Sequence, residues 1–192
     1  HAGDRLEAGF FRDRRLYRYA AIHAMSFGVN VIVGNWVVTL LEHHGHSKSV
    51  SSAAGSLTLL LGFFTRAGGG TLLRRADASR WVAASLVVGG AGIVVLALPL
   101  PIVALFVAAA VVGLAAGVPF AMAFTGAAAD RPEAPGAAVG FVNAWASLVI
   151  VAGTPLVGLT FSLPGNGRIG FVVVGVLAAL ASLATPRYVA TA

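Results

Sequence analysis

Arg66 is the residue whose chemistry is most informative, because it is a cation inside a hydrophobic run. The run begins near Val50 and reaches its natural end at Arg74. At a rise of about 1.5 Å per residue, Arg66 lies roughly 12 Å inside that end, within a hydrocarbon core about 30 Å thick. A charge at that depth costs at least about 2.5 kcal/mol, so it usually faces a polar cavity or a partner. Two interpretations are open: a group that coordinates an anion in a transport pathway, or a structural arginine that snorkels to the headgroups or joins helix ends.

Other polar or small side chains recur at helical spacing in neighbouring runs. In the first run they are His23, Ser26, Asn30 and Gly34, and in the fifth they are Asn143, Ser147 and Thr154. Residues three, four and seven apart share one face of a helix, so these faces are expected either to line a solvated cavity or to pack and bond between helices. The candidate substrate-binding residues are Arg66, Asn30, Asn143 and Ser147.

His23 is the histidine that lies within a hydrophobic run. It is a candidate proton carrier, because histidine titrates near neutral pH, and the alternative is a structural histidine near the interface. No Asp or Glu lies deep in a run, so proton coupling would depend on His23 or on a part of the protein outside this sequence. His43, His44 and His46 match no firm zinc-binding pattern, and the sequence predicts neither a metal site nor a cofactor.

Composition places the chain among integral membrane proteins. It is 58% hydrophobic and 10% charged, against about 45–50% and about 25% in ordinary soluble domains. Its net charge of +6 comes from arginines between hydrophobic runs, which indicates a topology signal rather than nucleic-acid binding. The absence of cysteine excludes disulfides and thiol redox chemistry.

The runs predict six membrane-spanning helices. They are Tyr19–Leu41, Val50–Leu73, Trp81–Leu100, Ile102–Ala129, Gly136–Phe161 and Ile169–Thr185. The breaks combine charge with Gly, Pro or Asn, except for the uncharged LPLP turn at 98–101. Helices are expected because a lipid-exposed backbone must satisfy its polar groups internally.

Basic residues predict the orientation. Ten lie on the side of the N-terminus: Arg5, Arg12, Arg14, Arg15, Arg18, Arg74, Arg75, Arg80, Arg131 and Arg187. Two, Lys48 and Arg168, lie on the other side. We therefore expect both termini to be cytoplasmic, in a plasma or inner membrane, with residues 1–18 as a basic linker or interfacial segment and residues 19–192 as the helical bundle.

Several motifs carry a resemblance to a known family. Residues 69–75 (GGTLLRR), which follow Arg66, are similar to the R-x-x-G-G-x-L-x-D-R motif that the major facilitator superfamily of transporters carries at the cytoplasmic end of a second helix. Residues 40–47, 132–140 and 152–158 resemble, in order, the outer end of the seventh helix, the inner loop before the eleventh and the Gly-x-x-Pro-x-x-Gly kink of the eleventh. The chain thus resembles, over about residues 15–190, the C-terminal six-helix half of such a transporter.

The resemblance implies a twelve-helix protein in which each half consists of two inverted three-helix repeats and the substrate binds near the bilayer midplane. The implied partners are the bilayer, a small-molecule substrate and the missing N-terminal half. Arg74 stands where the motif has aspartate, and Asp77 follows three residues later, so the implied gating loop is Arg74, Arg75 and Asp77 in altered form.

The nitrate and nitrite porters of this superfamily carry a similar arginine that coordinates the anion, so the resemblance implies that Arg66 binds a small inorganic or organic anion. The alternatives are a drug or metabolite exporter, and a scaffold or receptor on the same fold that transports nothing. An intramembrane serine protease does not fit, because Gly55-Ser56 lacks the Gly-x-Ser-x-Gly frame. We expect a transporter rather than an enzyme; substrate, direction and coupling ion stay open.

Overall fold

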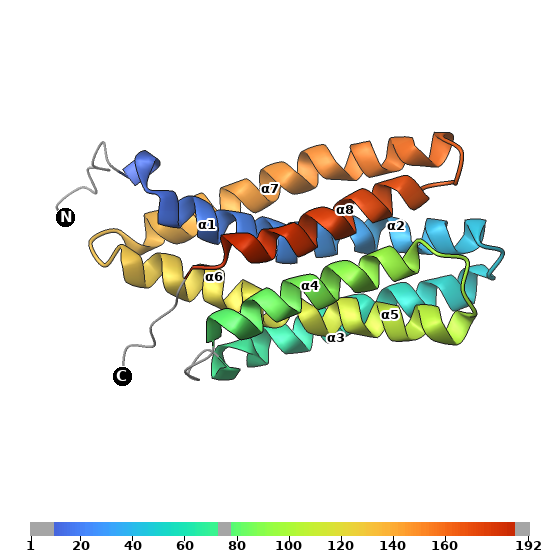
Figure 1. The fold of residues 1–192 in the computed structure, drawn as a ribbon, viewed down its shortest axis with the longest axis horizontal. Helices are drawn as coiled ribbons and strands as arrows, with labels where there is room; N and C mark the ends of the chain where they lie inside the picture. Colours follow the sequence, from blue (N-terminus) through green and yellow to red (C-terminus); the bar gives the residue numbers. More distant parts are fainter. Residues whose placement is uncertain (1–9, 73–77, 187–192) are drawn as a thin grey trace.

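The chain folds into helical rods that lie side by side along one long axis (Figure 1). A computed structural model describes residues 10–72 and 78–186, and within those ranges the regular structure is entirely helical. The first rod joins α1 (Arg14–His23), the π-helical turn η2 (Ala24–Gly28) and α2 (Val29–His43), after the short turn η1 (Phe10–Arg12). The remaining elements are α3 (Lys48–Leu72), α4 (Ala78–Leu96), α5 (Ile102–Ala115), α6 (Gly117–Asp130), α7 (Pro135–Leu159), η3 (Thr160–Ser162), α8 (Arg168–Leu180) and η4 (Ala181–Ala184).

The prediction of an all-α chain is confirmed for the described residues, and their long apolar helices are compatible with a membrane protein. Among the described residues, four continuous helical segments are long and apolar enough to cross a bilayer: Arg14–His43, Ala78–Leu96, Ile102–Asp130 and Pro135–Ser162. Arg168–Ala184 is a shorter apolar helix. Each rod contains one of the six predicted runs, although α3, which carries Arg66 and several glycines and serines, is not among the four.

The first helix begins five residues before its predicted start at Tyr19. Asp13 caps it, because its Oδ1 accepts a hydrogen bond of 2.8 Å from the backbone N–H of Arg15. A side-chain oxygen at this position satisfies one of the backbone donors left open at a helix start. Residues 14–18 are therefore helical.

The uncharged LPLP turn is a true boundary, since α4 ends at Leu96 and α5 begins at Ile102 after Pro101. The loop at 163–167 also turns sharply, and Gly165, Asn166 and Gly167 all have positive φ angles of 99°, 47° and 87°. Glycine and asparagine adopt this left-handed conformation at the least cost. Here the sequence signals and the structure agree.

The first three rods and the last three rods pack against each other in a regular pattern. The second rod, α3, packs along α5 and α6, and α7 packs along α1, η2 and α2. The third rod, α4, packs on α8. If the first three and last three rods are compared in order, the second rod of each set packs on the first rod of the other set, and the third rods pack on each other.

Small residues allow the closest of these contacts. A Cβ at Gly113 would lie 2.5 Å from the carbonyl oxygen of Thr58, and one at Gly117 would collide with the backbone of Thr65. Gly90 of α4 and Gly175 of α8 each face the other's backbone in the same manner. Helices in lipid associate by close packing rather than by the hydrophobic effect, so these contacts fix the positions of α3 and α4.

Two rods are interrupted partway along their length. The first contains the π-helical turn η2, and the fourth breaks at Ala116, between α5 and α6. Pro119 accounts for the second break, because a proline has no N–H and its ring clashes with the carbonyl four residues earlier, here that of Ala115. Pro119 is thus a local signal for the second break, whereas nothing in the sequence signals the π-helical turn.

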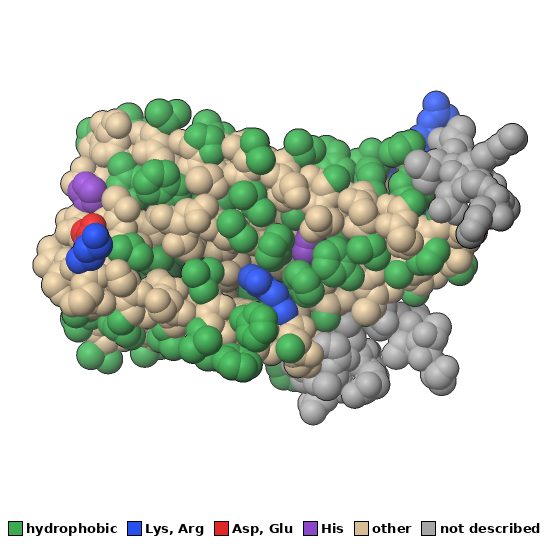
Figure 2. Space-filling view, turned by 180° about the vertical axis from the view of Figure 1, so that it is seen from behind, with side chains coloured by type: hydrophobic (Ala, Val, Ile, Leu, Met, Phe, Trp, Pro, Cys, Tyr) green, Lys and Arg blue, Asp and Glu red, His purple; other side chains and the backbone are tan. Residues whose placement is uncertain are grey.

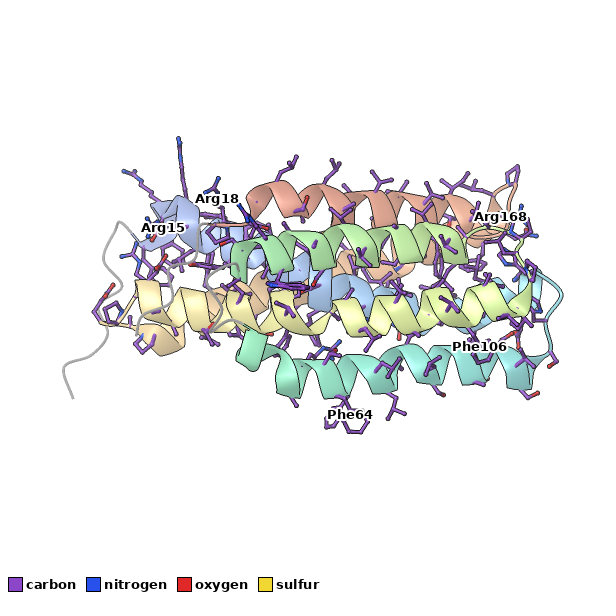
Figure 3. The ribbon with its side chains drawn as sticks, turned by 60° about the horizontal axis from the view of Figure 1, so that its bottom comes forward. Arg15, Arg18, Phe64, Phe106 and Arg168 are labelled. Carbon is purple, nitrogen blue, oxygen red and sulfur yellow. The ribbon has the colours of Figure 1, made fainter. Side chains whose placement is uncertain are left out.

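Charged side chains occupy the two ends of the bundle. Arg15 and Arg18 lie at one end and Arg168 at the other, while Phe64 points outward from the side of α3 (Figure 3). Among the described residues, Arg66 is the one Lys or Arg that lies between these ends. This segregation is what the basic-residue pattern predicted, and the side of the membrane on which each end lies stays a prediction.

Candidate functional site

Arg66 lies on α3, half-buried, and reaches the first rod. Its Nη2 donates a hydrogen bond of 3.1 Å to Oδ1 of Asn30, which is 2% exposed. Because a guanidinium has only donors, it must meet the oxygen of the Asn30 amide, and the amide nitrogen is left facing elsewhere. The structure thus brings together two of the residues that the sequence singled out.

Two buried donors in this pair have no protein partner. They are Nε of Arg66 and Nδ2 of Asn30. A buried donor without a partner typically costs about 1–3 kcal/mol, and more when the group is charged. The described part of the chain offers no carboxylate to Arg66, so the positive charge is not neutralised by an acidic side chain there.

Aromatic rings enclose the guanidinium. Its Cζ lies 4.9 Å from the ring centroid of Phe27 and 5.7 Å from that of Phe120. A cation over a ring face is attracted by the ring quadrupole, by about 0.5–2 kcal/mol depending on exposure. This contact offsets part of the cost of holding Arg66 inside the bundle.

His23 belongs to the same cluster. It is fully buried, and its ring centroid lies 4.4 Å from that of Phe124 and 5.3 Å from those of Phe27 and Phe120. Neither ring nitrogen has a hydrogen-bond partner. The polar groups that approach it are Asn143 of α7 and the charge of Arg66. The role of His23 as a proton carrier and the structural alternative both stay predictions.

The two interrupted rods position this cluster. Phe27 lies within the π-helical turn, with His23 just before it and Asn30 just after it, while Phe120 follows Pro119 at the start of α6. A π-helical turn adds one residue to a helical turn, so it shifts the face that the following residues present. Arg66 thus lies between rings from two broken helices.

The remaining predicted residues fall into two groups. Asn143 is exposed and contacts the cluster through His23, whereas Ser147 is exposed and donates to its own helix, at the carbonyl of Asn143, over 3.1 Å. Ser147 is not brought to Arg66. The predicted gating loop, Arg74, Arg75 and Asp77, lies outside the described residues.

The cluster reaches the surface on one side of the bundle. Arg66 is partly exposed and Asn143 is exposed. Figure 2 shows one face of the molecule, on which hydrophobic side chains are widespread and Lys and Arg side chains are few. A hollow of about 230 Å³ between α2, α7 and α8 is lined by apolar side chains and Thr160. Its lining offers nothing that would hold a charge.

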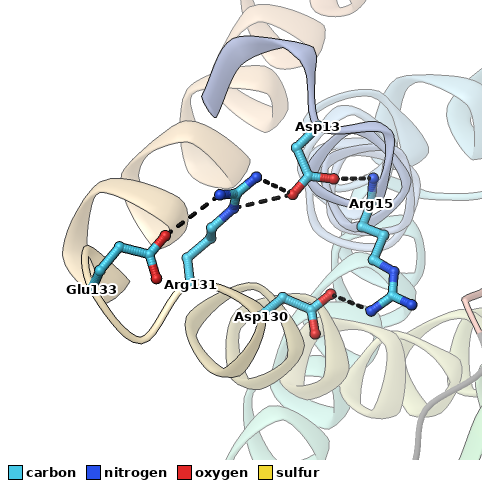
Figure 4. A network of polar contacts seen from close by, with 5 residues as sticks. All are labelled: Asp13, Arg15, Asp130, Arg131 and Glu133. Atoms are coloured by element: carbon cyan, nitrogen blue, oxygen red, sulfur yellow. Dashed lines mark hydrogen bonds and ion pairs between the residues drawn. The ribbon is translucent and has the colours of Figure 1, made fainter. Parts of the chain in front are cut away.

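A second polar cluster joins the helix ends (Figure 4). Nε of Arg131 donates to Oδ2 of Asp13 over 3.0 Å, and its Nη1 lies 3.4 Å from Oε1 of Glu133. Partial burial raises the pKa of Asp13, but the hydrogen bonds and charges of Arg15 and Arg131 outweigh it, so the pKa lies below the usual 3.8. The hydrogen bond from Arg131 to Asp13, aided by the opposite charges, raises the pKa of the guanidinium. This cluster ties α1 to the loop between α6 and α7.

The histidine-rich loop at the opposite end, which the structure describes, contains no cluster of three side chains that could hold a metal ion. Nε of Arg168 donates to Nε2 of His44 over 3.4 Å, and Nδ1 of His43 bonds the carbonyl of Thr39 over 2.8 Å. Desolvation, followed by the charge of Arg168 and the neighbouring histidines, lowers the pKa of His44. Among the described residues no three His, Cys, Asp or Glu side chains could hold a metal ion.

Sequence reasoning missed the aromatic members of the site. Phe27 lies four residues after His23 and three before Asn30, so it continues the polar face of the first run. A search for polar side chains alone passes over it. Phe120 and Phe124 are one turn apart after Pro119, and only the packing of α6 beside α3 places them at the site.

No protein-family model matches the chain, and no curated protein matches it. The resemblance to the major facilitator superfamily therefore rests on the short motifs of the sequence.

Proposed function

We propose that this chain is the C-terminal six-helix half of a secondary active transporter that moves a small anion across the cell membrane by alternating access. The observation that carries the proposal is the Arg66–Asn30 pair, a cation within the bundle whose remaining buried donors have no partner. An anion supplies acceptors for such donors and neutralises the charge. The other described basic residues lie at the two ends of the bundle, where the topology rule places such residues.

The packing of the rods supports the transporter architecture. Exchange of the second rods between the two sets of three, together with contact between the third rods, is the arrangement expected of two inverted repeats about an axis in the membrane plane. On this proposal the six rods are six membrane spans, and the end that carries Arg15, Arg18 and Arg131 is cytoplasmic.

The interruptions support the location of the site. The first and fourth rods are the first members of the two proposed repeats, and both are broken at the level of Arg66. Transporters commonly bind substrate where helices are discontinuous, because the breaks expose polar backbone and permit bending. The face that carries Arg66 would then meet the N-terminal half across the substrate cavity.

The test measures anion binding and thermal stability together on the full-length protein in nanodiscs. Arg66→Lys keeps the charge but loses the planar guanidinium fork, so we expect weaker anion binding. We expect Arg66→Ala to lower affinity by at least about tenfold, since each hydrogen bond to a charged group contributes about 1.5–3 kcal/mol. Arg80→Ala, at the end of the bundle, is the control and should bind as the wild type does.

A structural role for Arg66 predicts a different result. Both Arg66 variants would then lose melting temperature and expression, while the protein that survives binds anions with unchanged affinity. Unchanged affinity in a well-folded Arg66→Ala protein would refute the proposed function.

A further inference from the structure

The cluster around Arg66 also restricts the kind of anion. We propose that the ligand is a monocarboxylate with an apolar body about the size of a single ring, whose carboxylate meets Arg66 and Asn30 and whose body lies against Phe27, Phe120 and Phe124. This inference rests on the proposed function and goes further by naming the substrate class. Three observations carry it.

The first observation concerns charge. Arg66 is the one Lys or Arg between the ends of the bundle in the described residues, and those residues place no carboxylate beside it. One negative charge therefore completes the site. A second negative charge would lie in a medium of low dielectric constant without a fixed partner, which is strongly unfavourable.

The second observation concerns the donors. Nε of Arg66 and Nδ2 of Asn30 are buried without partners and belong to two side chains already joined by a hydrogen bond. An ionised carboxylate is an acceptor with two oxygens, so it can accept from both side chains at once. A neutral amide or an amine brings further N–H donors to a site whose own donors already lack acceptors.

The third observation concerns the walls. Phe27, Phe120 and Phe124 are each half-buried, so part of each side chain stays uncovered by the described residues. The rings of Phe120 and Phe124 meet edge to face with centroids 4.9 Å apart. An inorganic anion would leave this aromatic surface unused, whereas an apolar body would cover it and gain the stacking and burial that aromatic side chains provide.

The test compares four related ligands on the full-length protein in nanodiscs, by competition with radiolabelled benzoate. Benzoate is the reference, benzamide removes the charge, acetate removes the ring, and terephthalate adds a second carboxylate. We expect each of the other three to bind at least about tenfold more weakly than benzoate, because each loses an interaction or adds an unpaired charge. Acetate or terephthalate binding as tightly as benzoate would overturn the inference.

Variants assign the selectivity to the rings. We expect Phe120→Ala to reduce the preference for benzoate over acetate by about tenfold, and Phe27→Ala to act in the same direction, because each substitution removes one wall. Phe64→Ala is the matched control, since Phe64 lies on the same helix as Arg66 but is 60% exposed and points away from the bundle (Figure 3). An unchanged preference in both Phe27→Ala and Phe120→Ala would also overturn the inference. The ligand series on the wild-type protein decides the matter if a variant fails to fold.

The outcomes separate this inference from the proposed function. If acetate or nitrate binds as well as benzoate and Arg66→Gln abolishes that binding, the anion site stands and the monocarboxylate class is wrong. If no anion binds in a manner that depends on Arg66, the proposed function itself fails.

Discussion

The contact between α3 and α6 offers a sharp test, because two adjacent glycines of α3 have opposite surroundings. A Cβ built on Gly69 lies 2.5 Å from the carbonyl oxygen of Gly117 and 2.8 Å from its carbonyl carbon. A Cβ on Gly68 has no other atom within 4 Å, apart from its own helix and its chain neighbours. We therefore expect Gly69→Ala to destabilise the protein and Gly68→Ala to leave its stability unchanged or raised.

The magnitude follows from the geometry. The obstructing atoms at Gly69 are backbone, so the two helices must separate by about 0.9 Å to restore an ordinary contact of 3.4 Å. Overpacking of this kind typically costs about 1–3 kcal/mol. At about 2–4 °C per kcal/mol for a chain of this size, we expect Gly69→Ala to lower the melting temperature by about 2–12 °C. Gly68→Ala replaces a glycine in a helix interior and gains at most about 1 kcal/mol.

The same separation should reach the site. Arg66 precedes Gly69 by three residues on α3, and Phe120 follows Gly117 by three residues on α6. If α3 and α6 separate, the guanidinium of Arg66 therefore moves away from the ring of Phe120. Melting of both variants in nanodiscs, followed by benzoate binding, measures the two effects. Equal melting temperatures for Gly69→Ala and Gly68→Ala would show that α3 and α6 do not meet as described.

Three further predictions concern the ends and sides of the bundle. Asp13→Asn keeps a capping side chain but loses the ion pair with Arg131. Because the pKa of Asp13 is lowered on folding, the pair stabilises the protein above pH 3.8. Its contribution disappears as the pH falls below that value. The melting temperatures of wild type and variant should therefore differ at neutral pH and converge in acid, and a difference that persists in acid contradicts this account. Trp36→Phe removes the 2.8 Å hydrogen bond from Nε1 to the carbonyl of Thr154 on α7, so it should cost about 1 kcal/mol in thermal unfolding, and an unchanged melting temperature would exclude a contribution from that bond. In cells, a cysteine at Gly45 should react with a membrane-impermeant label from outside and one at Ser79 only from the cytoplasm; the reverse pattern would invert the topology.

Much of the fold could be predicted because it depends on local chemistry. The runs of apolar residues and the charged or glycine- and proline-rich breaks predicted where the helices lie, and the LPLP turn ended α4 despite its lack of charge. Pro119 accounts for the break in the fourth rod locally, because its ring and missing N–H act within one turn. The start of the first helix was missed, since the capping oxygen of Asp13 lies among arginines that read as a linker.

The site could be predicted only in part. Arg66 and Asn30 stood out because a charge or an amide in an apolar run has no local explanation, and the structure joins them. Ser147 stood out by the same criterion but bonds to its own backbone, because a serine in a helix can satisfy itself within one turn. The architecture of two inverted repeats, the transported anion and the orientation in the membrane stay predictions.

By itself the sequence determined what each segment would do in lipid: which segments are apolar helices, where they end, and that a single arginine lies between the charged ends. These properties depend on neighbours within a few residues along the chain. Only the tertiary structure decided that Phe27 and Phe120 enclose Arg66, because a π-helical turn shifts one face and the packing of α3 beside α6 brings the other. The relative position of two helices depends on the close contacts between them, at glycines such as Gly69 and Gly117, and no local pattern in either helix specifies which partner it will meet.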